Sequence, residues 1–253
     1  WSRTHLPHKD GGVAMSHRDF WASVMSVENN WIYYAALRLA AQVLPDGQVR
    51  EALVRERQGV YGWLQVQQTN RGLGDGIGAL DVYTHALLVG PEAHLEDGAW
   101  DAAGLAAWAK RHIDALDERF QIPGSALYDY TDAVESARIG RARLAWLEGT
   151  EQVSVAYRTW ARWFERQGDR AFAKTLRMKA AISHAQVMEY SLPVASALAL
   201  PNTTAALPTR TFLDGWEARP RSEPALNGTN WAYLAEADYN PFTTPLPPKR
   251  TAR

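Results

Sequence analysis

The spacing of apolar residues constrains the fold more than any other feature of this sequence. From about residue 16 to about residue 200, apolar side chains recur every three to four positions, which lines them along one face of an α-helix. Alternation of apolar and polar residues, the mark of a half-buried strand, is absent over any useful length. We therefore expect an all-α fold.

Glycine and proline breaks divide this region into successive helices. Ser16 is placed to cap the first helix, and Asp101 to cap the fourth. Gly168 lies in the tight connection between the last two helices. Short connections favour antiparallel helical hairpins, arranged either as an α/α toroid-like array or as a compact bundle. The expected helices cover about residues 16–44, 49–68, 79–89, 101–120, 131–147, 151–167 and 170–190.

The character of the chain changes at Pro193. Nine of the 13 prolines fall in the residues from 193 onward, and the helical spacing disappears there. The segment nevertheless keeps aromatic residues such as Trp216, Trp231 and Phe242, whereas disordered segments are poor in them. We expect residues 201–253 to pack as an irregular, Pro-rich wrap on a helical domain of residues 1–200, with only the last residues loose.

Composition excludes several classes of protein and partner. The net charge of −1 argues against nucleic acid or an anionic membrane surface as the main partner. The absence of cysteine excludes disulfides, thiolate metal sites and cysteine nucleophiles. No run of apolar residues is long enough to span a membrane. The 11 tryptophans either pack a core or form platforms for sugars and protein partners.

The chain begins at Trp1 rather than at methionine. A cleaved secretory signal would explain this beginning, and so would a shortened chain. We expect a periplasmic or secreted protein.

Two adjacent amides, Asn29 and Asn30, stand directly before Trp31 and two tyrosines. Asparagine is unfavourable inside a helix because its side chain competes for backbone hydrogen bonds. A helix that begins near Ser16 would place both amides well inside it, where a capping role does not explain them. We therefore interpret the pair as a polar patch with a binding role.

Asp81 and His85 lie four residues apart on an expected helix and so share one face. The acid could orient the imidazole as a base or bind a metal with it, and the alternative is a capped helix start with a hydrogen-bonded histidine. The sequence offers no third ligand, so we expect no metal and no cofactor. The glycine-rich stretch 72–78 lacks the Lys-Ser/Thr ending of a phosphate loop and is interpreted as a flexible connection.

Asp129, Asp132 and Glu135 form a short acidic series that Arg138 and Arg141 follow. Acids at the start of a helix and bases after them favour the helix dipole. The second acidic motif that a metal–diphosphate site requires is missing. We interpret the series as a structural helix start.

Asn29–Ala36, which reads NNWIYYAA, resembles the Asn-Asn-His-x-Tyr-Trp-Ala-Ala signature of alginate lyases. These are α/α-toroid enzymes that cleave uronate polysaccharides. The family carries a glycine turn and then a helix with Tyr-His-x-Tyr-Ala-Leu, and here Tyr83-Thr-His-Ala-Leu87 follows the glycine stretch at a similar distance. The resemblance covers about residues 25–90.

The resemblance implies a role for each matching residue. β-Elimination needs a neutralised substrate carboxylate, a base and an acid. Asn30 would neutralise the carboxylate, His85 would lie on the facing helix, and Tyr33 or Tyr83 would supply a phenol. Trp31 replaces the histidine of the signature, so whether any catalysis occurs stays open. The neighbouring residues expected to bind substrate are Asn29, Trp31 and Asp81.

Residues 159–181 are similar to a single tetratricopeptide-type helical hairpin. Small residues fall where the two helices would touch, but no second copy follows at that repeat length. The segment predicts a tight hairpin. Its functional interpretation is a scaffold that binds peptides.

Two functions follow from these patterns. The first is a protein that binds carbohydrate, such as a uronate polysaccharide, or cleaves it as a lyase. The alternative is a non-enzymatic helical subunit of a larger cell-envelope or secretion-type assembly. In that case the Trp-rich surface and the C-terminal segment would contact protein partners.

Overall fold

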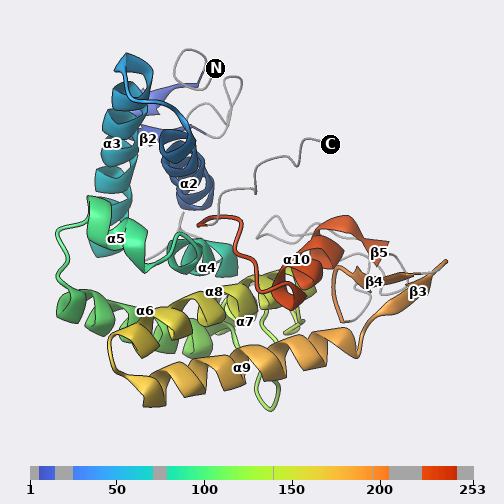
Figure 1. Ribbon diagram of the computed structural model, residues 1–253. Helices are drawn as coiled ribbons and strands as arrows, with labels where there is room; N and C mark the ends of the chain where they lie inside the picture. The colour runs from blue at the N-terminus through green and yellow to red at the C-terminus, as the bar shows by residue number, and fades with distance from the viewer. Residues whose placement is uncertain are drawn as a thin grey trace, which may run out of the picture.

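The computed structural model describes residues 6–14, 25–70, 79–138, 140–195, 197–204 and 224–243. Within these ranges the chain is mostly helical, with nine helices and two small sheets (Figure 1). The expected mostly α-helical class is confirmed, while the toroid-like arrangement stays a prediction. The helices are α2 (Val27–Val43), α3 (Gln48–Asn70), α4 (Leu80–Leu88), α5 (Pro91–Asp97), α6 (Ala102–Phe120), α7 (Ala133–Arg138), α8 (Leu147–Arg166), α9 (Arg170–Met188) and α10 (Leu226–Glu236).

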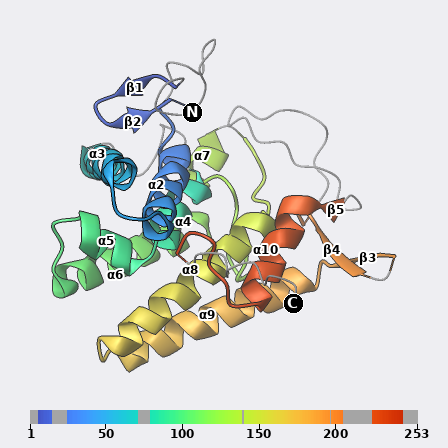
Figure 2. The ribbon, with the colours of Figure 1, turned by 45° about the horizontal axis from the view of Figure 1, so that its top comes forward.

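The strands are short and lie near the two ends of the described chain. β1 (His8–Lys9) and β2 (Gly12–Val13) form an antiparallel hairpin beside α3 (Figure 2). β3 (Leu192–Val194), β4 (Ala197–Pro201) and β5 (Pro224–Ala225) form an antiparallel sheet in that order. α10 packs against both β4 and α8.

Helix α4 is the centre of the fold. All nine of its residues are buried, as expected for a helix that is apolar on most sides. It packs against α2, α6 and α8, so it joins the α2–α3 pair to the layer formed by α6, α8 and α9 (Figure 1). Side chains on α4 are therefore the ones most enclosed by other elements.

A cluster of aromatic rings fills the core around His94. Trp31 lies 5.7 Å and Trp108 lies 4.7 Å from the His94 ring, measured between centroids. Trp108 contacts Trp160 at 5.9 Å, and Trp160 contacts Trp163 at 5.5 Å. Among the described residues, no tryptophan is more than partly exposed. These indoles stabilise the interior and do not form the Trp-rich surface that the alternative function assumed.

The hairpin expected over residues 151–190 is present as α8 and α9. Gly168 takes a left-handed φ of 88° in the connection, which glycine adopts without strain. The Asp169 carboxylate then accepts the backbone N–H of Phe172 and caps α9. Ala173 and Ala180 are fully buried against the neighbouring helices. The geometry agrees with a tight hairpin, while the relation to tetratricopeptide repeats stays a prediction.

The predicted start of the first helix at Ser16 lies outside the described residues, and a continuous helix over 16–44 is wrong. Met25 and Ser26 are not helical, and α2 begins at Val27. The Ser26 hydroxyl accepts the backbone N–H of Asn29 and caps the helix. Asn29 and Asn30 therefore stand in the first turn of α2.

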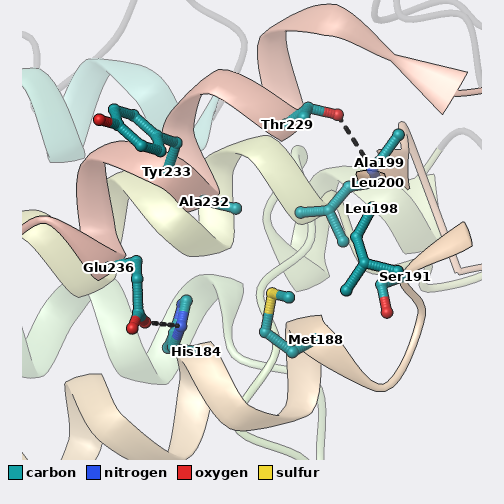
Figure 3. A pocket seen from close by; sticks show the side chains of 10 residues that line it. All are labelled: His184, Met188, Ser191, Leu198, Ala199, Leu200, Thr229, Ala232, Tyr233 and Glu236. Atoms are coloured by element: carbon teal, nitrogen blue, oxygen red, sulfur yellow. Dashed lines mark hydrogen bonds and ion pairs between the residues drawn. The ribbon is translucent and has the colours of Figure 1, made fainter. Parts of the chain in front are cut away.

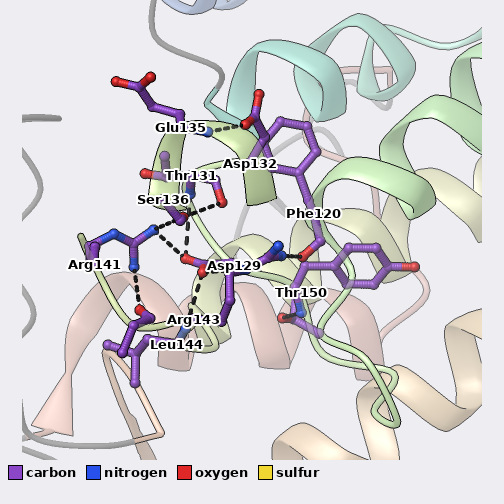
Figure 4. Close-up of polar contacts among 12 residues, drawn as sticks. Phe120, Asp129, Thr131, Asp132, Glu135, Ser136, Arg141, Arg143, Leu144 and Thr150 are labelled. Carbon is purple, nitrogen blue, oxygen red and sulfur yellow. Dashed lines mark hydrogen bonds and ion pairs between the residues drawn. The ribbon is translucent and has the colours of Figure 1, made fainter. Parts of the chain in front are cut away.

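The predicted helix over residues 131–147 is also wrong. Among the described residues from 131 to 146, only those of α7 are helical, and Gly140 follows with a φ of 68°. The chain then runs extended, because Arg141 and Arg143 both turn back to the buried carboxylate of Asp129 (Figure 4). An ion-pair cluster thus overrides the local helical pattern.

The C-terminal segment is more regular than expected, since it contains strands and the helix α10. Asn240 and Phe242 attach its described end to the helical body, while the division into a helical domain and a C-terminal wrap stays a prediction. The Asn240 amide donates to the Leu88 carbonyl at 2.8 Å and to the Thr159 hydroxyl at 3.1 Å. Phe242 is 9% exposed and packs its ring 5.2 Å from that of His85. Trp216 lies outside the described residues, and so does the glycine stretch 72–78.

Candidate functional site

The amide of Asn30 is fully used by the backbone around it. Its Nδ2 donates to the Val13 carbonyl at 2.9 Å and to the Ser26 carbonyl at 2.7 Å, and its Oδ1 accepts the Val13 N–H at 2.8 Å. The side chain is 1% exposed. Both amide hydrogens are engaged, so in this conformation none is left for a substrate carboxylate.

The other predicted residues on α2 take separate positions. Trp31 is completely buried in the aromatic core, where a sugar cannot reach its ring. The Tyr33 hydroxyl donates to the Glu56 carboxylate on α3. Asn29 is half-buried next to Ser26 at the helix cap. The structure does not gather these side chains around one opening.

The predicted residues on α4 are all buried. The Tyr83 hydroxyl accepts a hydrogen bond from Arg119, and its ring lies 5.3 Å from that of His112. The Asp81 carboxylate accepts the backbone N–H of Val82 at 2.9 Å. Both side chains hold the fold together, and their assignment to catalysis or substrate binding stays a prediction.

His85 is the predicted residue with unused chemical capacity. Its imidazole is 4% exposed and hydrogen-bonds to the backbone of Glu28 at the start of α2. Its Nδ1 is buried without a hydrogen-bond partner, which leaves Nε2 as the donor to Glu28. Burial lowers the pKa of His85 to about 4, so the ring is neutral at pH 7 with an open acceptor.

A glutamate that the sequence patterns did not single out lies near Glu28, whose backbone binds this histidine. Glu148, in the first turn of α8, is near the Glu28 carboxylate in the first turn of α2. Burial, and then the negative charge of Glu28, raises the pKa of Glu148 to about 7. Trp146 and Gln152 hydrogen-bond to the Glu148 carboxylate and partly offset this shift. Both glutamates are only partly buried, so a ligand can approach them.

The side chain of Gln152 provides a second hydrogen-bond acceptor without a partner, next to Glu148. Its Nε2 lies 3.4 Å from Oε1 of Glu148, and its Oε1 is buried without a partner. Buried polar atoms without partners are uncommon and concentrate where a protein binds or reacts. We call the group Glu28, His85, Trp146, Glu148 and Gln152 the glutamate-pair site.

The sequence could not have paired Glu28 with Glu148, because they belong to helices far apart in the chain. Each carboxylate alone is an ordinary acid in the first turn of a helix, where it favours the dipole. The packing of α4 against both α2 and α8 brings the two helix starts together. Only the central position of α4 could have suggested that the first turns of α2 and α8 lie close together.

The acidic series around Asp129 is a structural cluster (Figure 4). Arg141 and Arg143 contact the two oxygens of Asp129 at 2.7 and 2.8 Å, and the Leu144 N–H donates to it at 3.1 Å. Asp132 pairs instead with Arg119. These carboxylates are occupied by protein partners, but Arg141 and Arg143 lie beyond α7, so the predicted helical continuation through the basic residues is wrong.

Within the described ranges, no three side chains converge as ligands for a metal ion. Nor does any helix in the described part of the chain have the length and apolar character needed to cross a bilayer. No protein-family model, curated protein or solved structure matches this chain. The resemblances to alginate lyases and to tetratricopeptide repeats therefore stay predictions.

Proposed function

We propose that this protein binds carbohydrate and cleaves it with the carboxyl groups of Glu28 and Glu148. The observation that carries the proposal is the proximity of two partly exposed carboxyl groups, of which Glu148 has its pKa raised to about 7 by burial and by the negative charge of Glu28. Such a pair supplies an acid and a base at the same pH, which glycosidic bond cleavage requires.

Each glutamate takes one role. Glu148 holds its proton near neutral pH and donates it to the glycosidic oxygen as the bond to the leaving sugar breaks. Glu28 takes the other role, in which its carboxylate activates water or attacks the sugar carbon. The open acceptors of Gln152 and His85 are suited to sugar hydroxyls, which donate hydrogen bonds.

This proposal keeps the carbohydrate class but moves the chemistry away from Asn30. Both amide hydrogens of Asn30 bind backbone carbonyls, so it cannot neutralise a uronate in this conformation. His85 contributes through its unpaired Nδ1 rather than by facing Asn30.

The test compares Glu148→Gln with Glu189→Gln. Gln at position 148 keeps the size of the side chain but cannot donate a carboxyl proton, whereas Glu189 is an exposed acid at the end of α9. Each variant is assayed on a panel of neutral oligosaccharides and oligouronides for new reducing ends, for unsaturated sugars and for thermal protection by the glycan. Activity lost only in Glu148→Gln supports the proposal. A panel that gives no product and no protection with the unmodified protein overturns it.

The outer face of α9 favours a second function, that of a helical subunit in an assembly. Met178, Ala181, Ile182 and Ala185 follow the helical spacing and are all exposed. An apolar stripe of this kind is typical of a helix that packs against a partner. Light scattering distinguishes this function: Ile182→Asp should dissociate an oligomer, and a monodisperse monomer of the unmodified chain would argue against self-assembly.

A further inference from the structure

A pocket of about 280 Å³ lies between α9, α10 and β4, and its lining includes none of the residues of the glutamate-pair site (Figure 3). Met188, Leu198, Leu200 and Ala232 give it mostly apolar walls. Tyr233, which is 72% exposed, stands at its edge. Ligand pockets usually enclose about 300–1,000 Å³, so this one suits a small molecule.

One end of the pocket is polar. Figure 3 shows His184 and Glu236 together there, whereas Leu198 and Ser191 lie at the other end. The His184 Nε2 lies 3.1 Å from Oε2 of Glu236, and its Nδ1 lies 2.9 Å from Oε1 of Glu151. Both ring nitrogens face carboxylates, an arrangement that suits an imidazolium with two donors.

The two carboxylates differ in how firmly they are held. Glu151 is fully buried on α8, so it is a fixed partner for His184. The hydrogen bond to Glu151 is the main cause that raises the pKa of His184, with a further contribution from Glu236. The Glu236 side chain is 77% exposed, and an ion pair with so exposed a partner contributes little to stability. A ligand can therefore displace Glu236 at small cost.

The charges around the polar end favour an anion once Glu236 moves away. His184 and Glu151 then balance each other, and Arg158 adds a positive charge that acts on His184. The Arg158 guanidinium donates to the Ala235 carbonyl on α10, which holds it beside this end of the pocket. An ammonium group has no acceptor for the Nε2–H of His184, so it cannot replace Glu236 there.

We propose that the pocket binds a small monocarboxylate with an apolar tail, whose carboxylate replaces Glu236 at Nε2 of His184. The tail lies along the apolar walls toward Met188 and Leu198. The Thr229 hydroxyl in the pocket wall (Figure 3) already accepts the Leu200 N–H and donates to the Ala225 carbonyl. It therefore does not compete with His184 for the acid.

Calorimetry with three ligands of equal chain length tests the proposal. Octanoate, octanol and octylamine share the apolar tail and differ in the head group. Octanoate should bind at least tenfold more tightly than the other two, because only its head group accepts the Nε2–H with opposite charge. Equal binding of octanol, tighter binding of octylamine, or no binding of octanoate would each overturn the proposal.

Variants locate the binding site. Glu236→Gln removes the competing carboxylate and should tighten octanoate binding several-fold, while His184→Gln should weaken it by tenfold or more. Glu189→Gln, an exposed acid on the same side of the fold but outside the pocket lining, should leave the affinity unchanged. If His184→Gln does not fold, the imidazole signals of the unmodified protein are followed by NMR during the octanoate titration. An unmoved His184 signal, or weaker binding by Glu236→Gln, contradicts the proposal.

Discussion

Asn30 holds Val13 by two hydrogen bonds, accepting its N–H and donating to its carbonyl, as a neighbouring strand would. A side chain on a helix thus pairs with a strand that is only two residues long. The Asn30 amide also binds the Ser26 carbonyl, so a single residue fixes β2 to the start of α2. Asn30 therefore has a structural role and does not face an opening where a substrate could bind.

Replacing Asn30 by alanine should destabilise the protein strongly. The change leaves the N–H and carbonyl of the buried Val13 without partners, and unsatisfied buried groups cost roughly 1–3 kcal/mol each. We expect the free energy of unfolding from urea titration to fall by about 3 kcal/mol. The neighbouring Asn29→Ala should change it by less than about 0.5 kcal/mol, and equal effects of the two variants would contradict the assignment.

Three buried histidines should make the protein sensitive to mild acid. Burial lowers the pKa of His85 and His94 to about 4 and that of His112 to about 3, all below their ordinary value of 6.5. The unfolded chain then binds protons first as the pH falls. The contribution of these histidines to stability is complete above pH 6.5 and is lost from there down toward pH 4, by about 1.4 kcal/mol per pH unit for each histidine. Urea titrations across this window, in the Glu148→Gln background, measure the slope, and a flat profile would contradict it.

Glu148 should have the opposite effect on the pH dependence. The pKa of Glu148 in the folded state is about 7, above its ordinary value of 4.5. Its contribution to the free energy of unfolding is therefore present below pH 4.5 and is lost as the pH rises to 7. Gln resembles the protonated carboxyl group, so Glu148→Gln should remove this loss. We expect the variant to be more stable than the unmodified protein at pH 8 by about 2 kcal/mol, allowing for partial exposure of the site. Equal unfolding free energies at pH 8 would refute the raised pKa.

Asp129→Asn should be among the most damaging substitutions in the chain. Arg141 and Asp129 have completely buried side chains, and Arg143 shares the same carboxylate. Removing the negative charge leaves buried guanidinium groups uncompensated, which costs about 3–5 kcal/mol. Calorimetry should show a large fall in Tm, whereas Glu135→Gln, which affects only a solvent-exposed pair with Arg138, should leave Tm unchanged.

Replacing each of two helical glycines by alanine should change the stability of the protein in opposite directions. A Cβ at Gly149 would overlap the Trp146 ring and lie 2.8 Å from Leu80, so Gly149→Ala should destabilise the start of α8 and the glutamate-pair site. Gly62, within α3, has open space at this position, and alanine there should stabilise the protein by about 0.5–1 kcal/mol. Paired thermal melts test both signs, and a stabilised Gly149→Ala would disprove the close packing.

Local signals predicted the elements whose ends are determined by neighbouring residues. Asp101 caps α6 by accepting the Gly104 N–H, and the helix ends at Phe120 as its pattern indicates. The same holds for Asp169 at the start of α9. In these places the capping carboxylate and the apolar spacing agree, so the sequence alone is sufficient.

The predictions were wrong where contacts with residues distant in the sequence determine the local structure. The chain after α7 is extended because Arg141 and Arg143 bind Asp129, a contact that helical spacing cannot reveal. Glu28 and Glu148 likewise meet only through the packing of α4. His85 was found because it shares a motif with Asp81, but its unpaired nitrogen depends on the tertiary environment.

The coupled indoles of Trp31, Trp108 and Trp160 give the molecule an internal optical probe. Their rings are packed around His94 in the core, and none of the tryptophans that the structure describes lines the pocket between α9 and α10. The emission and near-ultraviolet dichroism of these three indoles should therefore change when the core loosens. They should change little when an acid enters that pocket. The tryptophan signals thus report unfolding alone, so calorimetry can record ligand binding in the same unlabelled protein without interference between the two.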